Sequence, residues 1–414
     1  MSGRTVLLVG ASVAGVRAAR ALRAQGHAGR IVLAGAEPHL PYDKPPLSKQ
    51  FLAGDWDTER LLLLTEQEAR DLDIELRLGS RAVELDPTGH LVRFEDGAEC
   101  GYDVCVVATG AAARPSPWQV DSGLHLVRSL ADADALRSDL ARGGHVVVIG
   151  AGFIGAETAS TARALGCEVT VVDPSLAPME RVLGAELGKL FVSLHERHGV
   201  RTRVGRAVRS VTGAAGSLAV TLDDGEILRA CTVVVGIGAV PNDDWLAGSG
   251  LRLADGVLCD EYGRAVGAEG VFAAGDVARW FHPGHQEHLR VEHWTNAVDQ
   301  AATVAHTIVH PEEPRPYAPV EYVWSDQYDW KIQIVGRPAT ATQHTVIGMF
   351  DENARAVALF GDEAGRLTAA VTVNWPRVLL ECRRLVAGGS TLDAAKRRVD
   401  ALAHPPVPAP GAAS

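Results

Sequence analysis

The chain has 414 residues and a formal net charge of −11, from 40 Lys and Arg against 51 Asp and Glu. One hydrophobic core rarely supports that length, so we expect two or three domains. The acidic balance argues against a protein that coats nucleic acid or an anionic membrane, because both surfaces attract basic proteins. The sequence contains no run of 18 apolar residues and no secretory leader, so we expect a cytoplasmic protein.

The first predicted elements form an internal repeat of strand, glycine-rich turn, helix and strand. The first copy has its strand over 5–10, its helix over 16–25 and its second strand over 30–37. The second copy has these elements over 145–150, 156–165 and 167–173. The strands are continuous runs of Val, Ile and Leu, which is typical of parallel strands buried on both faces.

Each copy is followed by another strand and turn, over 104–115 and 231–242, and a last apolar strand ends in an acid over 271–276. This order indicates an α/β protein with two Rossmann-like dinucleotide-binding domains, the second inserted in the first. The first domain would use residues 1–113 and 242–318, and the second would use residues 114–241.

A different composition begins after these domains. Alternating, aromatic segments over 320–336 and 346–373 predict antiparallel strands, and 378–386 and 392–402 predict helices. We therefore expect a small α+β domain over 319–403. The Pro- and Ala-rich end over 404–414 is expected to be disordered.

Both repeats place a glycine-rich turn where a helix N-terminus can hold a pyrophosphate. The second turn, Gly150-Ala151-Gly152-Phe153-Ile154-Gly155, matches the G-x-G-x-x-G pattern in full. The first turn, Gly10-Ala11-Ser12-Val13-Ala14-Gly15, departs from the pattern at Ser12, a residue small enough for close approach. The first turn alone could be purely structural, but two such cradles predict two dinucleotides.

An acid follows each cradle at the spacing of a ribose-binding residue. Glu37 comes 22 residues after Gly15, and Asp173 closes the second repeat. An acid there binds the 2′-hydroxyl of NAD and repels the 2′-phosphate of NADP. No Lys or Arg follows Asp173 until Arg181, so we expect NADH in preference to NADPH. The alternative for Asp173 is a turn acid beside Pro174.

Several segments resemble one known family: HLPYDKPPLSK (39–49), GAGFIGAETA (150–159), FAAGD (272–276), EHWTNA (292–297), WSDQYD (324–329) and NWPR (374–377). The chain resembles FAD-dependent, NADH-oxidising ferredoxin reductases of the oxygenase-coupled, putidaredoxin reductase-like type, within the pyridine nucleotide-disulfide oxidoreductase superfamily. The resemblance covers nearly the whole chain. It implies a glutathione-reductase-like core with FAD in the first cradle and NADH in the second.

The resemblance and the cradles together give the expected site residues. For FAD these are Gly10, Ser12, Ala14, Gly15, Glu37 at the ribose, Lys49, Val83 at the adenine, Thr109, Gly110, Arg128 at the pyrophosphate, Asp276 at the ribitol and Trp294 beside the isoalloxazine. For NAD they are Gly150, Gly152, Phe153, Ile154, Gly155, Glu157, Asp173, Arg181 and Gly238. No metal and no catalytic nucleophile are expected.

The resemblance also matches Lys49 and Glu157 to a Lys–Glu pair near flavin N5, where fixed charges tune the flavin. Glu157 could also act on the dipole of its helix, and three further site residues have plainer alternatives. Lys49 could be a solvated helix lysine, Trp294 could be ordinary core, and Asp276 could be a helix cap.

The cysteines bear on the reaction. Disulfide reductases of this fold keep C-x-x-x-x-C soon after the first repeat, and related NADH oxidases keep one cysteine there, but residues 38–48 contain none. Cys100 and Cys105 have that spacing, but five residues along one strand span roughly 17 Å, too far for a disulfide. A hairpin between them stays open, but it would lie in the wrong place for the flavin. The six scattered cysteines indicate reduced thiols and provide no relay from a flavin.

Without a thiol relay, electrons can leave to oxygen, a quinone or a one-electron carrier. The resemblance implies the third route. The chain would then be an NADH:ferredoxin oxidoreductase that takes hydride from NADH to FAD N5 and passes single electrons to an iron–sulfur ferredoxin serving an oxygenase. The alternatives are an NADH oxidase or quinone reductase, and an NADH-sensing flavoprotein.

The third domain is the expected docking face for ferredoxin. The resemblance places Trp324, Asp326, Gln327 and Trp330 near the exposed edge of the flavin. Basic residues that could steer an acidic partner are Arg290, Arg377, Arg383 and Arg384, with Trp375 beside them. The alternative for Arg383 and Arg384 is a solvated helix face. His282, His285 and His288 are irregularly spaced near Pro and Gly, so a surface loop is expected rather than a metal site.

Overall fold

The computed structural model describes residues 3–351 and 354–403, so the predicted tail over 404–414 lies outside the described residues. The chain divides into two compact units. The first unit consists of residues 1–115, 128–133 and 238–319, and the second consists of residues 116–127, 134–237 and 320–414. None of the described helices is long and apolar enough to cross a membrane.

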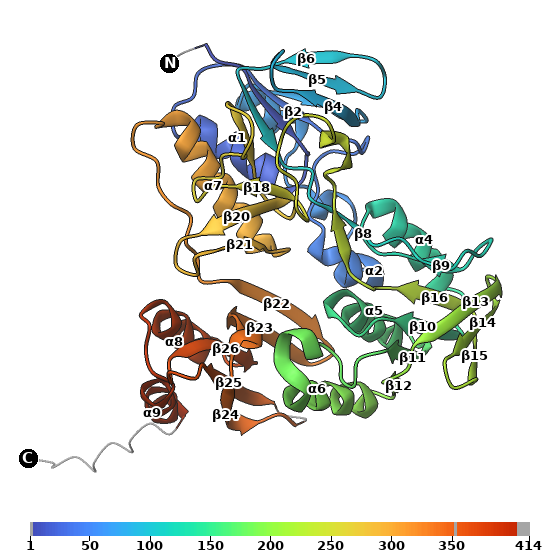
Figure 1. The fold of residues 1–414 in the computed structure, drawn as a ribbon. Helices are drawn as coiled ribbons and strands as arrows, with labels where there is room; N and C mark the ends of the chain where they lie inside the picture. The colour runs from blue at the N-terminus through green and yellow to red at the C-terminus, as the bar shows by residue number, and fades with distance from the viewer. Residues whose placement is uncertain (1–2, 352–353, 404–414) are drawn as a thin grey trace, which may run out of the picture. The chain divides into compact units, whose positions relative to one another are not determined.

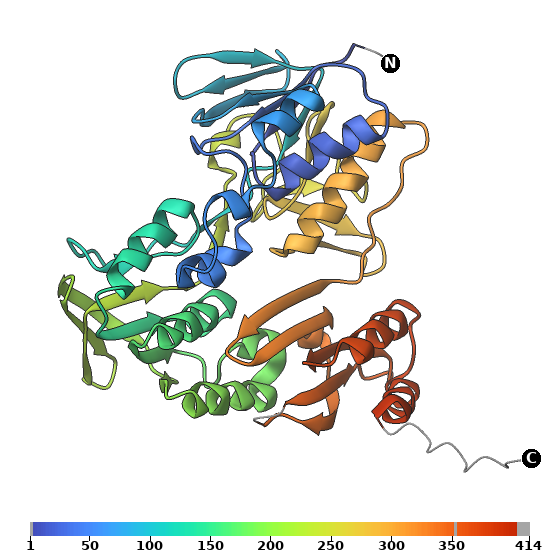
Figure 2. The ribbon, with the colours of Figure 1, turned by 180° about the vertical axis from the view of Figure 1, so that it is seen from behind.

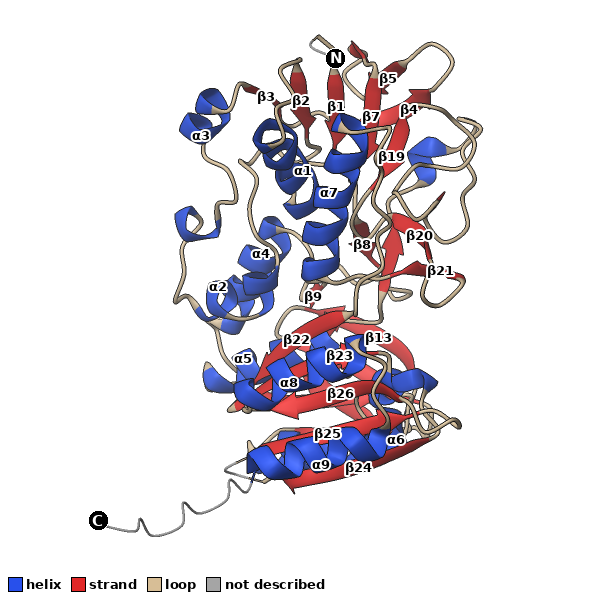
Figure 3. Ribbon diagram, turned by 90° about the vertical axis from the view of Figure 1, so that its left-hand side faces the viewer, coloured by secondary structure: helices blue, strands red, loops and turns tan. Residues whose placement is uncertain are grey.

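The first unit is built on a five-stranded parallel sheet in the order β19-β7-β1-β2-β3. Its strands are β1 (Val6–Val9), β2 (Ile31–Ala34), β3 (Ile74–Arg77), β7 (Val104–Val107) and β19 (Val271–Ala273). Helices α1 (Val13–Ala24) and α7 (Trp294–Val309) lie side by side on one face of the sheet (Figures 1 and 3). Smaller sheets cover the other face, which explains why β1 is buried along its whole length.

The remaining elements of the first unit are short. They are the antiparallel sheet β4 (Ala82–Asp86), β5 (Leu91–Phe94) and β6 (Glu99–Gly101), the sheet β18 (Val257–Cys259), β20 (Ala278–His282) and β21 (Glu287–Arg290), the pair β8 (Ala111–Ala113) and β17 (Ala239–Pro241), helices α2 (Gln50–Ala53) and α3 (Glu66–Asp71), and 3-10 turns Pro45–Ser48, Glu59–Leu61 and Asp244–Leu246. Helix α4 (Leu130–Leu140) begins in the first unit and ends in the second.

The second unit contains a matching parallel sheet in the order β12-β11-β10-β16-β9. Its strands are β9 (Leu124–His125), β10 (His145–Ile149), β11 (Glu168–Asp173), β12 (Arg201–Val204) and β16 (Thr232–Val235). Helices α5 (Phe153–Ala164) and α6 (Glu180–Arg197) follow β10 and β11. The antiparallel strands β13 (Val208–Ala214), β14 (Ser217–Leu222) and β15 (Ile227–Ala230) pack on the parallel sheet in one hydrophobic cluster.

The C-terminal part of the second unit is a five-stranded antiparallel sheet in the order β22-β23-β26-β25-β24. Its elements are β22 (Tyr322–Gln327), β23 (Trp330–Gly336), 3-10 turn Pro338–Thr340, β24 (Gln343–Met349), β25 (Arg355–Gly361), β26 (Leu367–Val373), α8 (Pro376–Ala387) and α9 (Leu392–Ala403). Helices α8 and α9 pack on one face of the sheet (Figure 2), and α6 packs on the other. The predicted strands and helices of this region are confirmed.

The predicted repeat is also confirmed, with one difference in the helix starts. Helices α1 and α5 begin at Val13 and Phe153, three residues before the predicted starts. Ser12 and Gly152 are the N-caps, so the last residues of each glycine-rich turn already form the first helical turn. This arrangement brings the free amides of each helix directly into its cradle.

We expect a buried histidine to make the second unit sensitive to acid. The ring of His195 on α6 is fully buried and its Nδ1 lies 2.7 Å from the hydroxyl of Tyr328. Burial lowers the pKa of His195 to about 4, from 6.5 in the unfolded chain. Between these values the unfolded state binds more protons, so stability is complete above about pH 6.5 and declines as the pH falls towards 4.

We expect this proton uptake to cost about 3 kcal/mol of unfolding free energy across that pH range. Urea unfolding at a series of pH values measures it. His195→Gln should make the profile shallower, although His293, whose burial also lowers its pKa to about 4, still contributes. His344→Gln, which removes an exposed histidine on β24, should leave the profile unchanged. Equal profiles for the wild-type protein and His195→Gln would show that His195 does not set the acid sensitivity.

Candidate dinucleotide sites

The first cradle requires glycine at both of its ends. Gly10 has φ +124°, and an added Cβ would lie 2.0 Å from the carbonyl oxygen of Ala108. A Cβ on Gly15 would lie 2.0 Å from the carbonyl oxygen of Gly10. These close approaches hold the start of α1 against the end of β1, so the amides of the first helical turn converge on the loop. The geometry suits a bound pyrophosphate.

The second cradle repeats this geometry. Gly150 has φ +103°, and its added Cβ would lie 2.2 Å from the carbonyl oxygen of Gly236, while a Cβ on Gly155 would lie 1.9 Å from that of Gly150. By contrast, no described atom lies within 4 Å of a Cβ added at Gly152. Packing therefore explains the outer glycines, and the middle glycine leaves room for a ligand in front of the helix amides.

The predicted ribose acid of the first cradle is held by two donors. The hydroxyl of Tyr42 donates to Glu37 Oε2 at 2.6 Å, and Lys44 Nζ donates to Glu37 Oε1 at 3.1 Å. Glu37 remains 41% exposed at its side chain, so it can accept a further hydrogen bond. Burial lowers the pKa of Lys44, and the nearby carboxylate of Glu37 opposes that effect. The sequence did not indicate the roles of Tyr42 and Lys44.

Tyr42 gives a test of this network. Its hydroxyl also accepts the buried backbone amide of Leu130 at 3.0 Å. We expect Tyr42→Phe to lower the free energy of unfolding by about 2 kcal/mol, because it leaves that amide without an acceptor and removes a donor from Glu37. Chemical unfolding of the FAD-loaded protein measures the change.

Tyr102→Phe is the matched control for Tyr42→Phe. The hydroxyl of Tyr102 is buried and has no hydrogen-bond partner among the described residues. Its removal should therefore change the unfolding free energy by less than about 0.5 kcal/mol. Equal losses in the two variants would contradict the proposed network.

The second acid, Asp173, lies between two backbone amides at the end of β11. Its Oδ2 accepts the amide of Ala151 in the cradle at 2.6 Å, and its Oδ1 accepts the amide of Ser175 at 2.7 Å. Asp173 is thus a turn acid, the alternative raised by the sequence. The same contacts place its carboxylate beside the cradle, as a ribose-binding acid requires. The two roles are compatible because a carboxylate has about four acceptor sites.

Arg128 and Asp276 form an ion pair in the first unit, with Nη2 and Oδ2 3.0 Å apart. Asp276 follows β19 and precedes β20, so it does not cap a helix. A Cβ added at Gly110, which has φ +67°, would lie 3.5 Å from the guanidinium of Arg128. The structure therefore brings three predicted FAD residues, Arg128, Asp276 and Gly110, to one place.

Trp294 is the first residue of α7 and is only partly buried, so it is not ordinary core. Its Nε1 donates to Asp43 Oδ1 at 2.8 Å, and Arg17 lies 5.6 Å from its ring centroid. Burial raises the pKa of Asp43, although the hydrogen bond from Trp294 acts in the opposite direction. The indole is thus held at its polar edge by Asp43, while the guanidinium of Arg17 lies over its ring.

Thr109 and Asn242 connect two segments of the first unit that are far apart in the sequence. The hydroxyl of Thr109 donates to the backbone carbonyl of Asn242 at 2.8 Å. The side-chain amide of Asn242 donates to the backbone carbonyl of Thr109, also at 2.8 Å. Asn242 was not among the predicted residues. Val83, predicted at the adenine, lies on β4 with 44% of its surface exposed.

The remaining predicted residues divide between the units. Lys49 and Gly238 belong to the first unit, whereas Glu157 belongs to the second. Ile154 is 44% exposed at the start of α5, and Glu157 on the same helix is buried. Arg181 lies on α6, but its side chain is outside the described part of the structure. The pairing of Lys49 with Glu157 therefore stays a prediction.

All six cysteines are free thiols, as predicted. Cys100 lies on β6 and Cys105 on β7, both buried, and neither is near the first cradle in sequence. Burial raises the pKa of five of the thiols, to about 12 for Cys382; the other four are Cys100, Cys105, Cys167 and Cys259. Only Cys231 is partly exposed.

The expected docking residues are only partly available. Gln327, Trp330 and Trp375 are buried, and Trp330 packs edge-to-face on Phe191 with ring centroids 5.7 Å apart. These three side chains therefore do not contribute to the surface of the second unit. Helix α8 does expose three of the predicted basic residues, Arg377, Arg383 and Arg384, although Arg384 pairs with Glu381.

Arg290 does not join that basic surface. Its side chain is 12% exposed and pairs with Asp255 at 3.0 Å and with Glu292 at 2.5 Å. His282, from the predicted surface loop, has a structural role. One ring nitrogen lies 3.0 Å from the carbonyl oxygen of Pro319, and the other accepts the amides of the β20–β21 turn.

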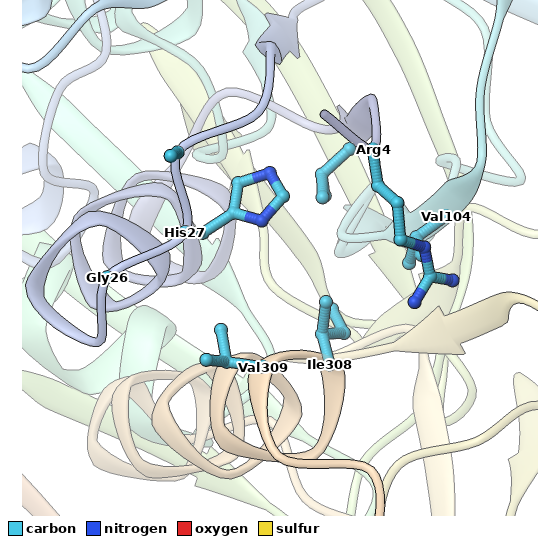
Figure 4. Close-up of a pocket in the computed structure, with 8 residues that line it drawn as sticks. Arg4, Gly26, His27, Val104, Ile308 and Val309 are labelled. Atoms are coloured by element: carbon cyan, nitrogen blue, oxygen red, sulfur yellow. The ribbon is translucent and has the colours of Figure 1, made fainter. Parts of the chain in front are cut away.

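A separate cavity lies at the amino end of β1, lined by Arg4, His27 and apolar side chains that include Val104, Ile308 and Val309 (Figure 4). The glycine-rich turn follows the opposite, carboxyl end of β1. The cavity is therefore not part of the first cradle.

Comparison with known proteins identifies the family. The family model described as pyridine nucleotide-disulphide oxidoreductase matches residues 4–301. The chain belongs to this family. A second model, described as reductase C-terminal, matches residues 322–402, which span the antiparallel sheet with α8 and α9. The predicted α/β fold with an additional C-terminal domain is confirmed.

The relatives within the family are reductases. The chain is 38% identical to rhodocoxin reductase of Rhodococcus erythropolis, over 92% of this chain and 89% of that protein. It is also 38% identical to the ferredoxin–NAD(+) reductase component of the anthranilate 1,2-dioxygenase system of Burkholderia cepacia, over 95% of this chain and 96% of that protein. The structure of a covalent putidaredoxin reductase–putidaredoxin complex superposes with a TM-score of 0.89 and 29% identity, over 94% of each chain.

These matches confirm the resemblance to oxygenase-coupled ferredoxin reductases and show that the chain is an oxidoreductase. Enzymes of this family use FAD and NAD(H), so the prediction of two dinucleotides from the two cradles is confirmed.

Proposed function

We propose that the chain is an NADH:ferredoxin oxidoreductase that supplies electrons to an oxygenase. The net reaction takes one hydride from NADH and delivers two electrons, one each, to two molecules of a small iron–sulfur ferredoxin, with release of one proton. Bound FAD supplies the chemistry that links a two-electron donor to a one-electron acceptor. The relatives named above support this assignment, since one is a ferredoxin–NAD(+) reductase component.

The observation that carries the proposal is the pair of cradles without an adjacent redox cysteine. Each cradle is followed by an acid at the spacing expected of a ribose-binding residue, and the segment 38–48 contains no cysteine. The nearest cysteines in the first unit are buried thiols with raised pKa values. A disulfide relay would need a reactive thiolate beside the flavin. Electrons therefore leave to an external acceptor.

We assign FAD to the first cradle and NADH to the second. In the first unit, Arg128, with the helix amides, would face the pyrophosphate, Glu37 would accept from the ribose, and Asp276 would bind the ribitol. In the second, Asp173 would accept the adenosine ribose hydroxyls. Lys49 and Glu157 would lie near flavin N5, where their charges set the local field.

We further propose the domain boundaries, the docking face and the cellular location of the protein. The domains are an FAD domain over 1–113 and 242–318, an NAD domain over 114–241 and a C-terminal domain over 319–403. The exposed arginines of α8 contribute to the ferredoxin docking face, since electron-transfer contacts are small and steered by charge. The protein acts in the cytoplasm, where its thiols stay reduced.

A coupled assay tests the proposal. The FAD-loaded protein, NADH and cytochrome c are mixed with and without a candidate ferredoxin from an oxygenase system. We expect fast cytochrome reduction only when the ferredoxin is present. Equal rates without it, with consumption of oxygen or of an added quinone, would establish the NADH oxidase or quinone reductase alternative. A single slow turnover under all conditions would instead favour an NADH sensor.

A further inference from the structure

A chain of buried polar side chains connects the second cradle to the C-terminal sheet. The hydroxyl of Ser325 donates to Glu157 Oε1 at 2.8 Å, and Gln327 Nε2 lies 3.1 Å from Ser325 Oγ. Glu157, Ser325 and Gln327 are 3%, 0% and 0% exposed. Glu157 is the fifth residue of α5, directly after the cradle, whereas Ser325 and Gln327 are on β22.

The strand geometry explains why these two side chains act together. Alternate residues of a strand point to the same face, so Ser325 and Gln327 both face α5. The backbone amide of Tyr328, which follows β22, donates to Ser160 Oγ on α5 at 2.7 Å. Ser160 lies three residues after Glu157 and hence on the same side of the helix. The β22 segment is thus hydrogen-bonded to α5 at two positions, Glu157 and Ser160.

The chain of contacts also reaches the cradle loop from a second direction. Gln327 Nε2 lies 3.6 Å from the sulfur of Met179, and the amide of Met179 donates to the carbonyl of Ala151 inside the cradle at 3.2 Å. Met179 has φ +54°, a left-handed conformation that non-glycine residues rarely adopt. Gln327 therefore contacts the group that holds the loop as well as the serine that holds Glu157.

A buried carboxylate needs donors, and the direction of each donor fixes the carboxylate orientation. A serine hydroxyl has a single proton to donate. With Gln327 Nε2 pointing at Ser325 Oγ, the serine proton is left for Glu157. Gln327 thus sets the direction in which the serine hydroxyl donates. Its own Oε1 is buried without a partner among the described residues, which makes this arrangement costly to keep for packing alone.

We propose that Ser325 and Gln327 are positioning residues for NADH, which hold Glu157 in the orientation that receives the nicotinamide half of the nucleotide. The C-terminal sheet is then part of the NADH site. The proposal rests on the assignment of NADH to the second cradle. The adenosine half of NADH binds at Asp173 and the helix amides, so these two residues should act only on the nicotinamide half.

The test compares two probes by titration calorimetry on the FAD-loaded protein: NAD⁺, and ADP-ribose, which lacks nicotinamide. We expect Ser325→Ala to weaken NAD⁺ about tenfold, the loss typical of one hydrogen bond to a charged group, and to leave ADP-ribose unchanged. Ser325→Thr keeps the hydroxyl and should recover most of the NAD⁺ affinity. Gln327→Met should fall between Ser325→Ala and the wild-type protein.

Thr372→Val is the matched control, because Thr372 carries another buried hydroxyl of the same sheet, 3.5 Å from the carbonyl of Gln333. It should leave both affinities unchanged. Equal weakening of NAD⁺ and ADP-ribose in Ser325→Ala would overturn the proposal in favour of a general packing role, as would unchanged NAD⁺ affinity.

This experiment also separates the inference from the proposed function. A wild-type protein that binds NAD⁺ with the expected variant pattern but does not reduce ferredoxin would support the inference and reject the ferredoxin assignment. A wild-type protein that binds ADP-ribose but in which Ser325→Ala changes nothing would reject the inference alone.

Discussion

A Gly152→Val variant should fold, retain its FAD and bind NADH about a hundredfold more weakly than the wild-type protein. Gly152 is the N-cap of α5 with φ −75° and ψ −172°, an extended conformation that any residue adopts. A Cβ there meets no described atom within 4 Å. The valine would instead fill the space in front of the helix amides, where a pyrophosphate must approach. Gly152→Ala should show a smaller loss in the same direction.

Titration with ADP-ribose, with FAD absorbance as a check on folding, measures this effect. The reciprocal variant is Ser12→Val in the first cradle, where the serine hydroxyl makes no capping bond to the described helix. It should lower the FAD content and leave the ADP-ribose affinity unchanged. Unaltered ADP-ribose binding in Gly152→Val would mean that the second cradle does not hold the nucleotide.

The second large effect is expected at Asp173. Asp173→Ala removes the acceptor of two backbone amides, those of Ala151 and Ser175. Hydrogen bonds to a charged group contribute about 1.5–3 kcal/mol each, so the cradle loop should lose its shape and NADH affinity should fall about a hundredfold. Asp173→Asn keeps one carbonyl oxygen and should give an intermediate loss. Both variants should raise the ratio of NADPH to NADH affinity, because the charge that repels a 2′-phosphate is gone.

Glu168→Gln is the control for this series, since Glu168 begins the same strand, β11, that Asp173 ends. Its side chain is 73% exposed and pairs with Arg201 at 3.0 Å. Exposed pairs of this kind contribute little, so both nucleotide affinities should stay at the wild-type value. If the NADPH to NADH ratio were the same in Asp173→Ala and in the wild-type protein, Asp173 would shape the loop without contacting the ribose.

The cradles could be predicted because their determinants are local. Gly10 and Gly150 have positive φ, which a tight turn requires. The acid lies at the end of the strand that follows the helix, so one short sequence pattern contains all parts of the cradle. The contacts that complete each site are not local. Thr109 and Asn242 are 133 residues apart, and Glu157 and Ser325 are 168 residues apart. A sequence motif with fixed spacing cannot identify contacts between residues so far apart.

The burial of Gln327 and Trp330 in the segment 324–330 could not be predicted from the sequence, for a different physical reason. Alternation along β22 and β23 correctly indicated strands, but it indicates an exposed face only when one side of the sheet meets water. Here α6 covers the face that carries Trp330, and α5 with Met179 covers Gln327, so both side chains are buried. Arg290 failed because its partner Asp255, 35 residues away, neutralises it.

The burial of five thiols has a practical consequence for labelling. Alkylating reagents attack the thiolate, and a buried thiol with a raised pKa forms little of it near neutral pH. Maleimide chemistry should therefore modify Cys231 first, and the natural sequence should accept a single fluorophore or spin label there. Cys231 precedes β16, whereas the cradle lies past its far end at Gly236. A reporter at that position would sit on the nucleotide-binding sheet without blocking the nucleotide.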